Sequence, residues 1–195
     1  NLSQSELIVG SSSFYDLNFL TYNYISYLNH TKGYALSIQS LGVKSQNDNW
    51  TNPNGSSLSK EVSLSFSQGY DLLKDKNSSL TIGYSLNYML LEQTSSAGPS
   101  GDGSDGLLGG QISLFGIDIG VLSSLRDKII IGAFIKNINS PSINKGSSIQ
   151  YLPQRLSIGI TYMPFDKLKT NVQIEKLLGN SDNQFRFGME YELND

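Results

Sequence analysis

The chain has 195 residues, of which 38% are hydrophobic and 16% charged, and its 14 basic and 17 acidic side chains give a net charge of -3. This length suggests one domain over residues 1–195, and the charge balance gives no electrostatic footprint for nucleic acid. The absence of cysteine excludes a disulfide scaffold and cysteine-based metal sites, and the single histidine leaves little for metal or triad chemistry. We therefore expect a protein without enzymatic activity, metal or other cofactor.

The sequence carries no targeting or helical membrane signal. Its longest run without a polar residue, Ile129 to Ile135, is far shorter than the ~20 residues of a membrane-spanning helix. The opening Asn-Leu-Ser-Gln lacks the basic and apolar regions of a signal peptide. Because there is also no initiator Met, we expect a processed or trimmed chain whose location must be inferred from its body.

Apolar and polar residues alternate along most of the chain, which is typical of strands because successive side chains point to opposite faces. In 128–137 both parities are apolar at Ile129, Ile130 and Ile131, so the facing of this segment is ambiguous. No segment shows a convincing 3.6-residue period. The pattern predicts an all-β protein with about ten strands, near residues 4–14, 17–29, 32–44, 60–70, 80–90, 107–123, 128–137, 155–162, 168–175 and 184–191.

The predicted connections are of two kinds. Short polar breaks occur at 74–77, 140–141, 164–166 and 179–182, whereas 45–59 and 93–106 are long and rich in Ser, Asn and Gly, and 138–153 is intermediate. Short turns at one end and long loops at the other are typical of bacterial outer-membrane barrels. The pattern therefore favours an antiparallel up-and-down barrel.

The amphipathic strands fit two architectures. In a soluble, secreted β-sandwich acting as a binding module, the apolar face would form a dry core containing Tyr84, Ile158, Ile160 and Phe187. In a transmembrane barrel the same face would contact lipid. The residues that we predict to face lipid are Leu80, Ile82, Tyr84, Ile158, Ile160, Val172, Ile174, Phe185 and Phe187.

Three features favour the barrel. The predicted strands of about 9–12 residues match a tilted membrane crossing and exceed the ~5–6 residues of ordinary strands. Their polar face is mostly Ser, Thr, Asn, Gln and Gly, where a water-exposed face would carry more Lys and Glu. Aromatic residues lie near strand ends, as an interfacial girdle requires; they are Tyr88, Tyr151, Tyr162, Phe165 and Tyr191.

A small set of charged residues lies on the polar parity of the predicted strands. Asp118 is flanked by two isoleucines, and burial against Lys136 or another cation of the lumen would account for it. The others could plug the lumen or set an ion preference, or simply compensate one another's charge, which we favour. The predicted lumen-facing charges are Asp118, Lys136, Arg155, Lys169, Glu175, Arg186 and Glu190.

Two further features are weak candidates for sites. The run from Gly101 to Gly106 contains two carboxylates but lacks the ligand spacing of an EF-hand, so we interpret it as an external loop. His30 lies at a predicted turn, and the sequence has no Gly-x-Ser-x-Gly elbow that would give it a nucleophile partner. Neither feature predicts catalysis or metal binding.

Residues 115–195 resemble the PorV/PorQ family of outer-membrane barrels, which is itself similar to the FadL fatty-acid transporters. The resemblance lies in the order and spacing of short phrases, and it continues more loosely through 33–38 and 80–86. Members usually have about fourteen strands, and outer-membrane barrels tend to end on an aromatic residue, so this chain resembles part of a larger barrel. A ten-strand barrel closed on itself is the alternative. The matching phrases are Phe115-Gly116-Ile117-Asp118-Ile119-Gly120-Val121, Ile131 to Ile138, Leu152 to Gly159 and Phe187-Gly188-Met189-Glu190-Tyr191.

The resemblance implies a location in the bacterial outer membrane and two alternative functions. A PorV-like member would anchor secreted cargo or other components of type IX-like secretion at the cell surface, with loops 45–59, 93–106 and 138–153 as the docking surface. A FadL-like member would transport hydrophobic small molecules through its lumen. We expect outer-membrane lipid as a partner in both cases, and the lack of a recognisable plug segment favours the secretion role.

Overall fold

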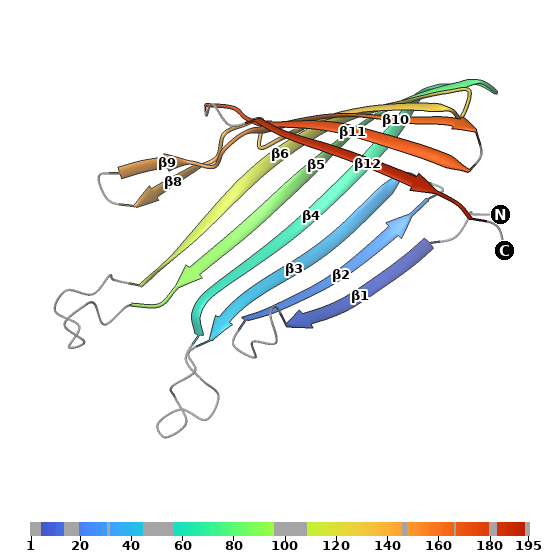
Figure 1. The fold of residues 1–195 in the computed structure, drawn as a ribbon. Helices are drawn as coiled ribbons and strands as arrows, with labels where there is room; N and C mark the ends of the chain where they lie inside the picture. Colours follow the sequence, from blue (N-terminus) through green and yellow to red (C-terminus); the bar gives the residue numbers. More distant parts are fainter. Residues whose placement is uncertain are drawn as a thin grey trace. The chain divides into compact units, whose positions relative to one another are not determined.

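The structure is a computed structural model, and it describes residues 5–13, 20–30, 32–44, 57–95, 109–145, 148–165, 167–179 and 183–193. All regular elements of these ranges are β-strands (Figure 1). The described residues include no helix long and apolar enough to cross a membrane. The strands are β1 (Ser5–Ser13), β2 (Leu20–Asn29), β3 (Tyr34–Lys44), β4 (Ser57–Lys74), β5 (Ser78–Gln93), β6 (Gly110–Leu125), β7 (Ile129–Lys136), β8 (Ser142–Lys145), β9 (Ser148–Tyr151), β10 (Arg155–Phe165), β11 (Leu168–Leu177) and β12 (Asn183–Tyr191).

Ten of the strands form one sheet in chain order, β1-β2-β3-β4-β5-β6-β7-β10-β11-β12. Neighbouring strands are antiparallel, so the predicted all-β, up-and-down arrangement is confirmed. Among the described residues, β1 and β12 are the two edges of this sheet. The strands β8 and β9 form a separate hairpin in the connection between β7 and β10.

Two details of the prediction were wrong. The region 138–153 was expected to be a loop, but it contains the β8–β9 hairpin, in which Ser142 is paired with Tyr151. The strands β4 and β5 have 18 and 16 residues, longer than the expected strands at 60–70 and 80–90. The polar residues at their ends hid this length, because backbone pairing continues after the apolar alternation stops. The loop segments 45–56 and 96–108 lie outside the described residues.

The chain divides into two compact units, and each is described by itself. Unit 1 comprises Asn1–Phe66 and Asn87–Phe115, and unit 2 comprises Ser67–Leu86 and Gly116–Asp195. In unit 1, β1 and β2 pair from Ser5↔Asn29 to Ser13↔Thr21, and β2 continues with β3. In unit 2, the C-terminal part of β6 pairs with β7, followed by β10, β11 and β12. Most of the predicted site residues belong to unit 2.

The structure contains almost no buried apolar side chains. Among the described residues, Leu114 is the only hydrophobic one in the buried class, and no side chain is fully buried. The side chains that a soluble sandwich would place in its core are accessible instead: Ile158 is 44% exposed and Phe187 72%. A sheet whose apolar face remains uncovered needs another apolar environment, because exposed patches of this kind mark contacts with membranes or partners.

Candidate functional site

The strand registers of unit 2 define which residues share a face. Directly opposed residues of an antiparallel pair lie on the same side of the sheet, and Ile158 is opposed by Ala133 on β7 and by Ile174 on β11. The next strand continues this face, with Ile174 opposite Phe185 and Val172 opposite Phe187. The predicted lipid-facing residues of β10, β11 and β12 therefore form one continuous apolar face.

The opposite face carries the predicted charges. Glu175 of β11 is 8% exposed, and both of its carboxylate oxygens are engaged. Nε of Arg155 lies 3.3 Å from its Oε1, and Nη1 of Arg186 lies 3.0 Å from its Oε2. Arg186 also donates from Nη2 to Oε1 of Gln184 at 2.9 Å. Three neighbouring strands are thus joined by one carboxylate between two guanidinium groups, the mutual compensation that the sequence suggested.

A second ion pair lies nearer the other end of these strands. Nζ of Lys169 is 3.7 Å from Oε2 of Glu190, and both side chains are largely exposed. The two residues occupy directly opposed positions on β11 and β12. An exposed pair of this kind contributes little to stability.

Asp118 is buried, with 5% of its surface exposed, as its apolar neighbours suggested. Its Oδ1 accepts a hydrogen bond from the backbone N–H of Asn137 at 2.8 Å. Asn137 has a positive φ of 55° and is itself 5% exposed. Its Nδ2 donates to the backbone carbonyl of Pro153 at 3.3 Å. The carboxylate therefore fixes the point where the chain leaves β7, a role that residue spacing did not indicate.

Lys136 of β7 lies directly opposite Arg155 of β10. No carboxylate among the described residues lies within 4 Å of the Lys136 ammonium group. Like charges in directly opposed positions repel each other and destabilise a sheet unless an anion compensates them. On this face the three cations Lys136, Arg155 and Arg186 outnumber the two carboxylates of Asp118 and Glu175, so this end of the polar face carries a net positive charge.

An open hollow with a volume of about 630 Å³ adjoins these cations. On the face of the charged residues, its lining includes glycines from several strands and three apolar side chains, those of Leu122, Ile130 and Phe134. The polar residues Ser157, Thr161, Asn171 and Gln173 line it on the same face. Gly132 and Gly159 are directly opposed, and Phe134 is opposed by Ser157. The sequence analysis did not predict the apolar residues of the hollow as site residues. The run Ile129-Ile130-Ile131, which is apolar on both parities, indicated that an apolar side chain lies on the polar face.

Three glycines of the hollow, Gly120, Gly132 and Gly159, are not required by close packing, whereas a Cβ atom added to Gly83 would lie 3.3 Å from the carbonyl oxygen of Gln68. A Cβ atom added to Gly159 would find the carbonyl oxygen of Val172 as its nearest atom, at 3.6 Å. A Cβ on Gly132 would meet Cδ1 of Leu122 at 3.5 Å, and one on Gly120 would meet Cδ2 of Phe134 at 3.4 Å. These are ordinary contacts. Gly120, Gly132 and Gly159 therefore leave open space above the sheet that small side chains could occupy without disturbing the strands.

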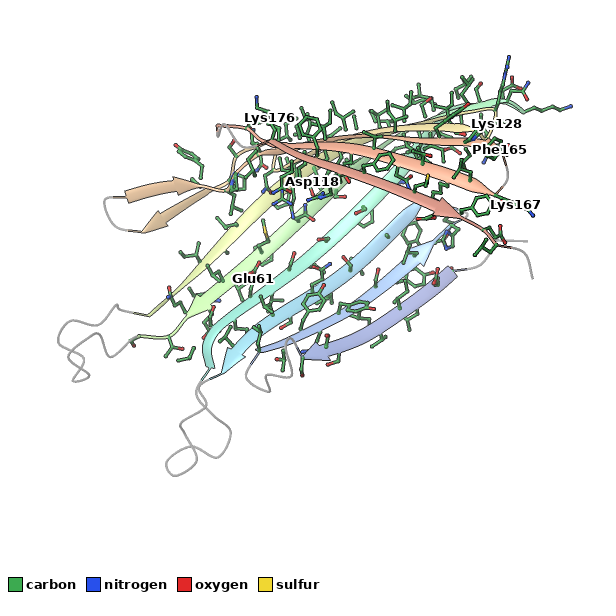
Figure 2. The ribbon with its side chains drawn as sticks, viewed as in Figure 1. Glu61, Asp118, Lys128, Phe165, Lys167 and Lys176 are labelled. Atoms are coloured by element: carbon green, nitrogen blue, oxygen red, sulfur yellow. The ribbon has the colours of Figure 1, made fainter. Side chains whose placement is uncertain are left out.

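The ends of the strands in unit 2 carry basic and aromatic residues. Figure 2 shows Lys128, Phe165 and Lys167 together at one end, and Lys176 toward the other. The first three lie at the short connections between β6 and β7 and between β10 and β11. Phe165 and Tyr162 are strongly exposed. Aromatic and basic residues at the rim of an apolar face are typical of a membrane interface.

The remaining candidates lie in unit 1 or outside the described residues. His30 is at a turn, and its Nε2 lies 3.4 Å from Oε2 of Glu6, a contact that the sequence did not predict. A smaller hollow of about 270 Å³ is lined by Tyr22, Gln39, Leu41, Glu61 and Ser63. The run Gly101–Gly106 lies outside the described residues. The described residues contain no group of three or more His, Cys, Asp or Glu side chains that could hold a metal ion.

The sequence matches no protein-family model and no curated protein. Among solved structures, the chain is similar to a deltaS2S3 mutant of the TodX monoaromatic hydrocarbon channel, with 11% sequence identity and a TM-score of 0.44. The similarity covers 88% of this chain and 59% of the channel. The chain thus spans about three fifths of the length of that protein.

Proposed function

We propose that this chain is part of a bacterial outer-membrane β-barrel that transports hydrophobic small molecules and has no catalytic activity. The observation that carries the proposal is the apolar hollow at Leu122, Ile130 and Phe134, which lies on the otherwise polar face of the sheet. Three large apolar side chains on that face are not needed for lipid contact, because the opposite face supplies it. They are suited to an apolar molecule in the lumen.

The strand dimensions support the membrane location. The strand β10 has 11 residues, which span about 35 Å at the usual rise of a β-strand. At the usual tilt of about 40°, this length crosses about 27 Å, close to the ~25 Å height of the apolar band of outer-membrane barrels. The exposed apolar face of β10, β11 and β12 would contact lipid, and the Glu175 cluster would face the lumen.

The role as an anchor for secretion, which the resemblance to PorV first favoured, remains a prediction. It depends on a docking surface made by loops 45–59, 93–106 and 138–153. Most of the first two loops lies outside the described residues. The hollow gives transport a specific structural basis within the described strands, and we therefore prefer the FadL-like function.

Two measurements test the proposal. Purified protein should require detergent or lipid and should show a heat-modifiable band on a gel; a sharp monomer in plain buffer without this shift would contradict the membrane location. In detergent, the neutral fluorescent probe N-phenyl-1-naphthylamine should bind above the background of empty micelles. Gly159→Leu, which places a side chain in the hollow, should weaken this binding. Thr170→Leu on the opposite face is the matched control and should leave it unchanged.

A further inference from the structure

The polar face of unit 2 changes from apolar to cationic along two neighbouring strands. On β7 the residues of this face are Ile130, Gly132, Phe134 and Lys136, and the opposed residues on β10 are Thr161, Gly159, Ser157 and Arg155. Phe134 and Ser157 line the hollow. Lys136 and Arg155 are each two residues further along, about 7 Å away. An apolar surface and a pair of cations thus lie within the length of one small molecule.

The cations retain binding capacity for an anion. Arg155 approaches Glu175 through Nε, so its two terminal nitrogens can form the two parallel hydrogen bonds by which guanidinium groups bind a carboxylate. Lys136 has no carboxylate within 4 Å among the described residues. A carboxylate bound between Lys136 and Arg155 would remove the repulsion between these directly opposed charges. The charge of this end of the face therefore complements an anionic group.

The hollow is broad and short. Its lining extends across β5, β6, β7, β10 and β11, a width of about 19 Å at the usual spacing of strands. Along β7, the lining side chains on this face extend only from Ile130 to Phe134, a distance of about 13 Å. Gly132 and Gly159 leave bare backbone at its floor. A flat ring can lie on such a floor beside the aromatic ring of Phe134.

We propose that this site binds planar aromatic carboxylates, with the ring in the glycine-floored hollow and the carboxylate between Lys136 and Arg155. The inference rests on the proposed transport function and specifies its substrate. A site that only buried the ring would bind the neutral analogue as tightly as the acid. The two cations distinguish the acid from its neutral analogue because a charge-assisted hydrogen bond is about twice as strong as a neutral one.

The test is equilibrium binding of 2-naphthoate and its neutral analogue 2-naphthamide to the purified chain in a nonionic detergent. We expect the acid to bind about tenfold more tightly, the effect of one charge-assisted contact. Lys136→Gln should remove this preference, and so should Arg155→Gln. Lys169→Gln, which removes a cation from the distant ion pair, is the matched control and should preserve it. A heat-modifiable band on a gel shows whether each variant is folded. If Arg155→Gln does not fold, the result for Lys136→Gln decides the test.

The outcomes separate this inference from the proposed function. Equal binding of acid and amide, with both weakened by Gly159→Leu, would overturn the carboxylate site and leave the apolar transport function standing. Tighter binding of decanoate than of 2-naphthoate, dependent on Lys136, would overturn the preference for a planar ring. If 2-naphthoate and 2-naphthamide both fail to bind while N-phenyl-1-naphthylamine binds, only the carboxylate site is overturned. If N-phenyl-1-naphthylamine also fails to bind, the proposed transport function is overturned as well.

Discussion

Glu175 of β11 and Arg186 of β12 are diagonal neighbours on adjacent strands, with Nη1 of the arginine 3.0 Å from Oε2 of the glutamate. The carboxylate is nearly buried, and Arg155 approaches it from the other neighbouring strand. A single acidic side chain therefore compensates two cations and joins three strands of unit 2. Removal of its charge would leave Arg155 and Arg186 without this compensation.

We expect Glu175→Gln to lower the free energy of unfolding by about 1–3 kcal/mol, because hydrogen bonds to charged groups are lost and the cations repel each other. The arginines are about half exposed, which places the loss below that of a fully buried pair. Urea unfolding of the protein in lipid vesicles measures it. Glu190→Gln, which removes the exposed pair with Lys169, is the control and should change stability by less than about 0.5 kcal/mol. Equal effects of both variants would contradict a structural role of the Glu175 cluster.

Asp118 offers a second test, since its carboxylate accepts the backbone N–H of Asn137. Asp118→Ala leaves this buried donor without its acceptor and should destabilise the protein by about 1–3 kcal/mol. Asp118→Asn keeps a side-chain oxygen as the acceptor and should lower the free energy of unfolding clearly less. The midpoints of urea unfolding provide the comparison. If the alanine variant is as stable as the wild type, the contact does not hold the end of β7.

The two faces of β10 should respond differently to a new charge. Ile158→Lys places an ammonium group on the apolar face, and near the middle of a bilayer this costs about 2–4 kcal/mol. Ser157→Lys places the same group on the polar face, where we expect a much smaller loss. Folding yield and unfolding free energy in lipid vesicles measure both. A larger loss for Ser157→Lys would reverse our assignment of the faces to lipid and lumen.

Gly10 of β1 lies directly opposite Tyr24 of β2, and the tyrosine ring lies where a side chain at position 10 would be. A glycine covered by a cross-strand aromatic ring is a known device for fixing strand register. Gly10→Ala should displace the ring and destabilise the protein by about 1 kcal/mol, the size of one cross-strand pair. Gly188→Ala is the control, because an added Cβ there meets no atom within 4 Å. In thermal unfolding, Gly10→Ala should have a lower midpoint temperature than Gly188→Ala.

The alternation of apolar and polar residues determined much of the fold. It predicted the all-β class, the up-and-down order and the approximate position of every strand in the main sheet, because the period of two is a local property of the extended chain. It failed for the β8–β9 hairpin and for the full length of β4 and β5. In those segments backbone pairing, rather than side-chain alternation, sets the limits of the strand.

Register, in contrast, was decided only by the tertiary structure. The sequence left the facing of 128–137 ambiguous, and the pairing of Phe134 with Ser157 placed Phe134 and Ile130 on the polar face. The same register placed Lys136 opposite Arg155, and the turn after β7 brought the N–H of Asn137 to Asp118. A shift of one residue would move every side chain of a strand to the other face. The sequence by itself therefore determined that strands form, whereas the positions of charge and apolar surface in the site depend on long-range backbone pairing.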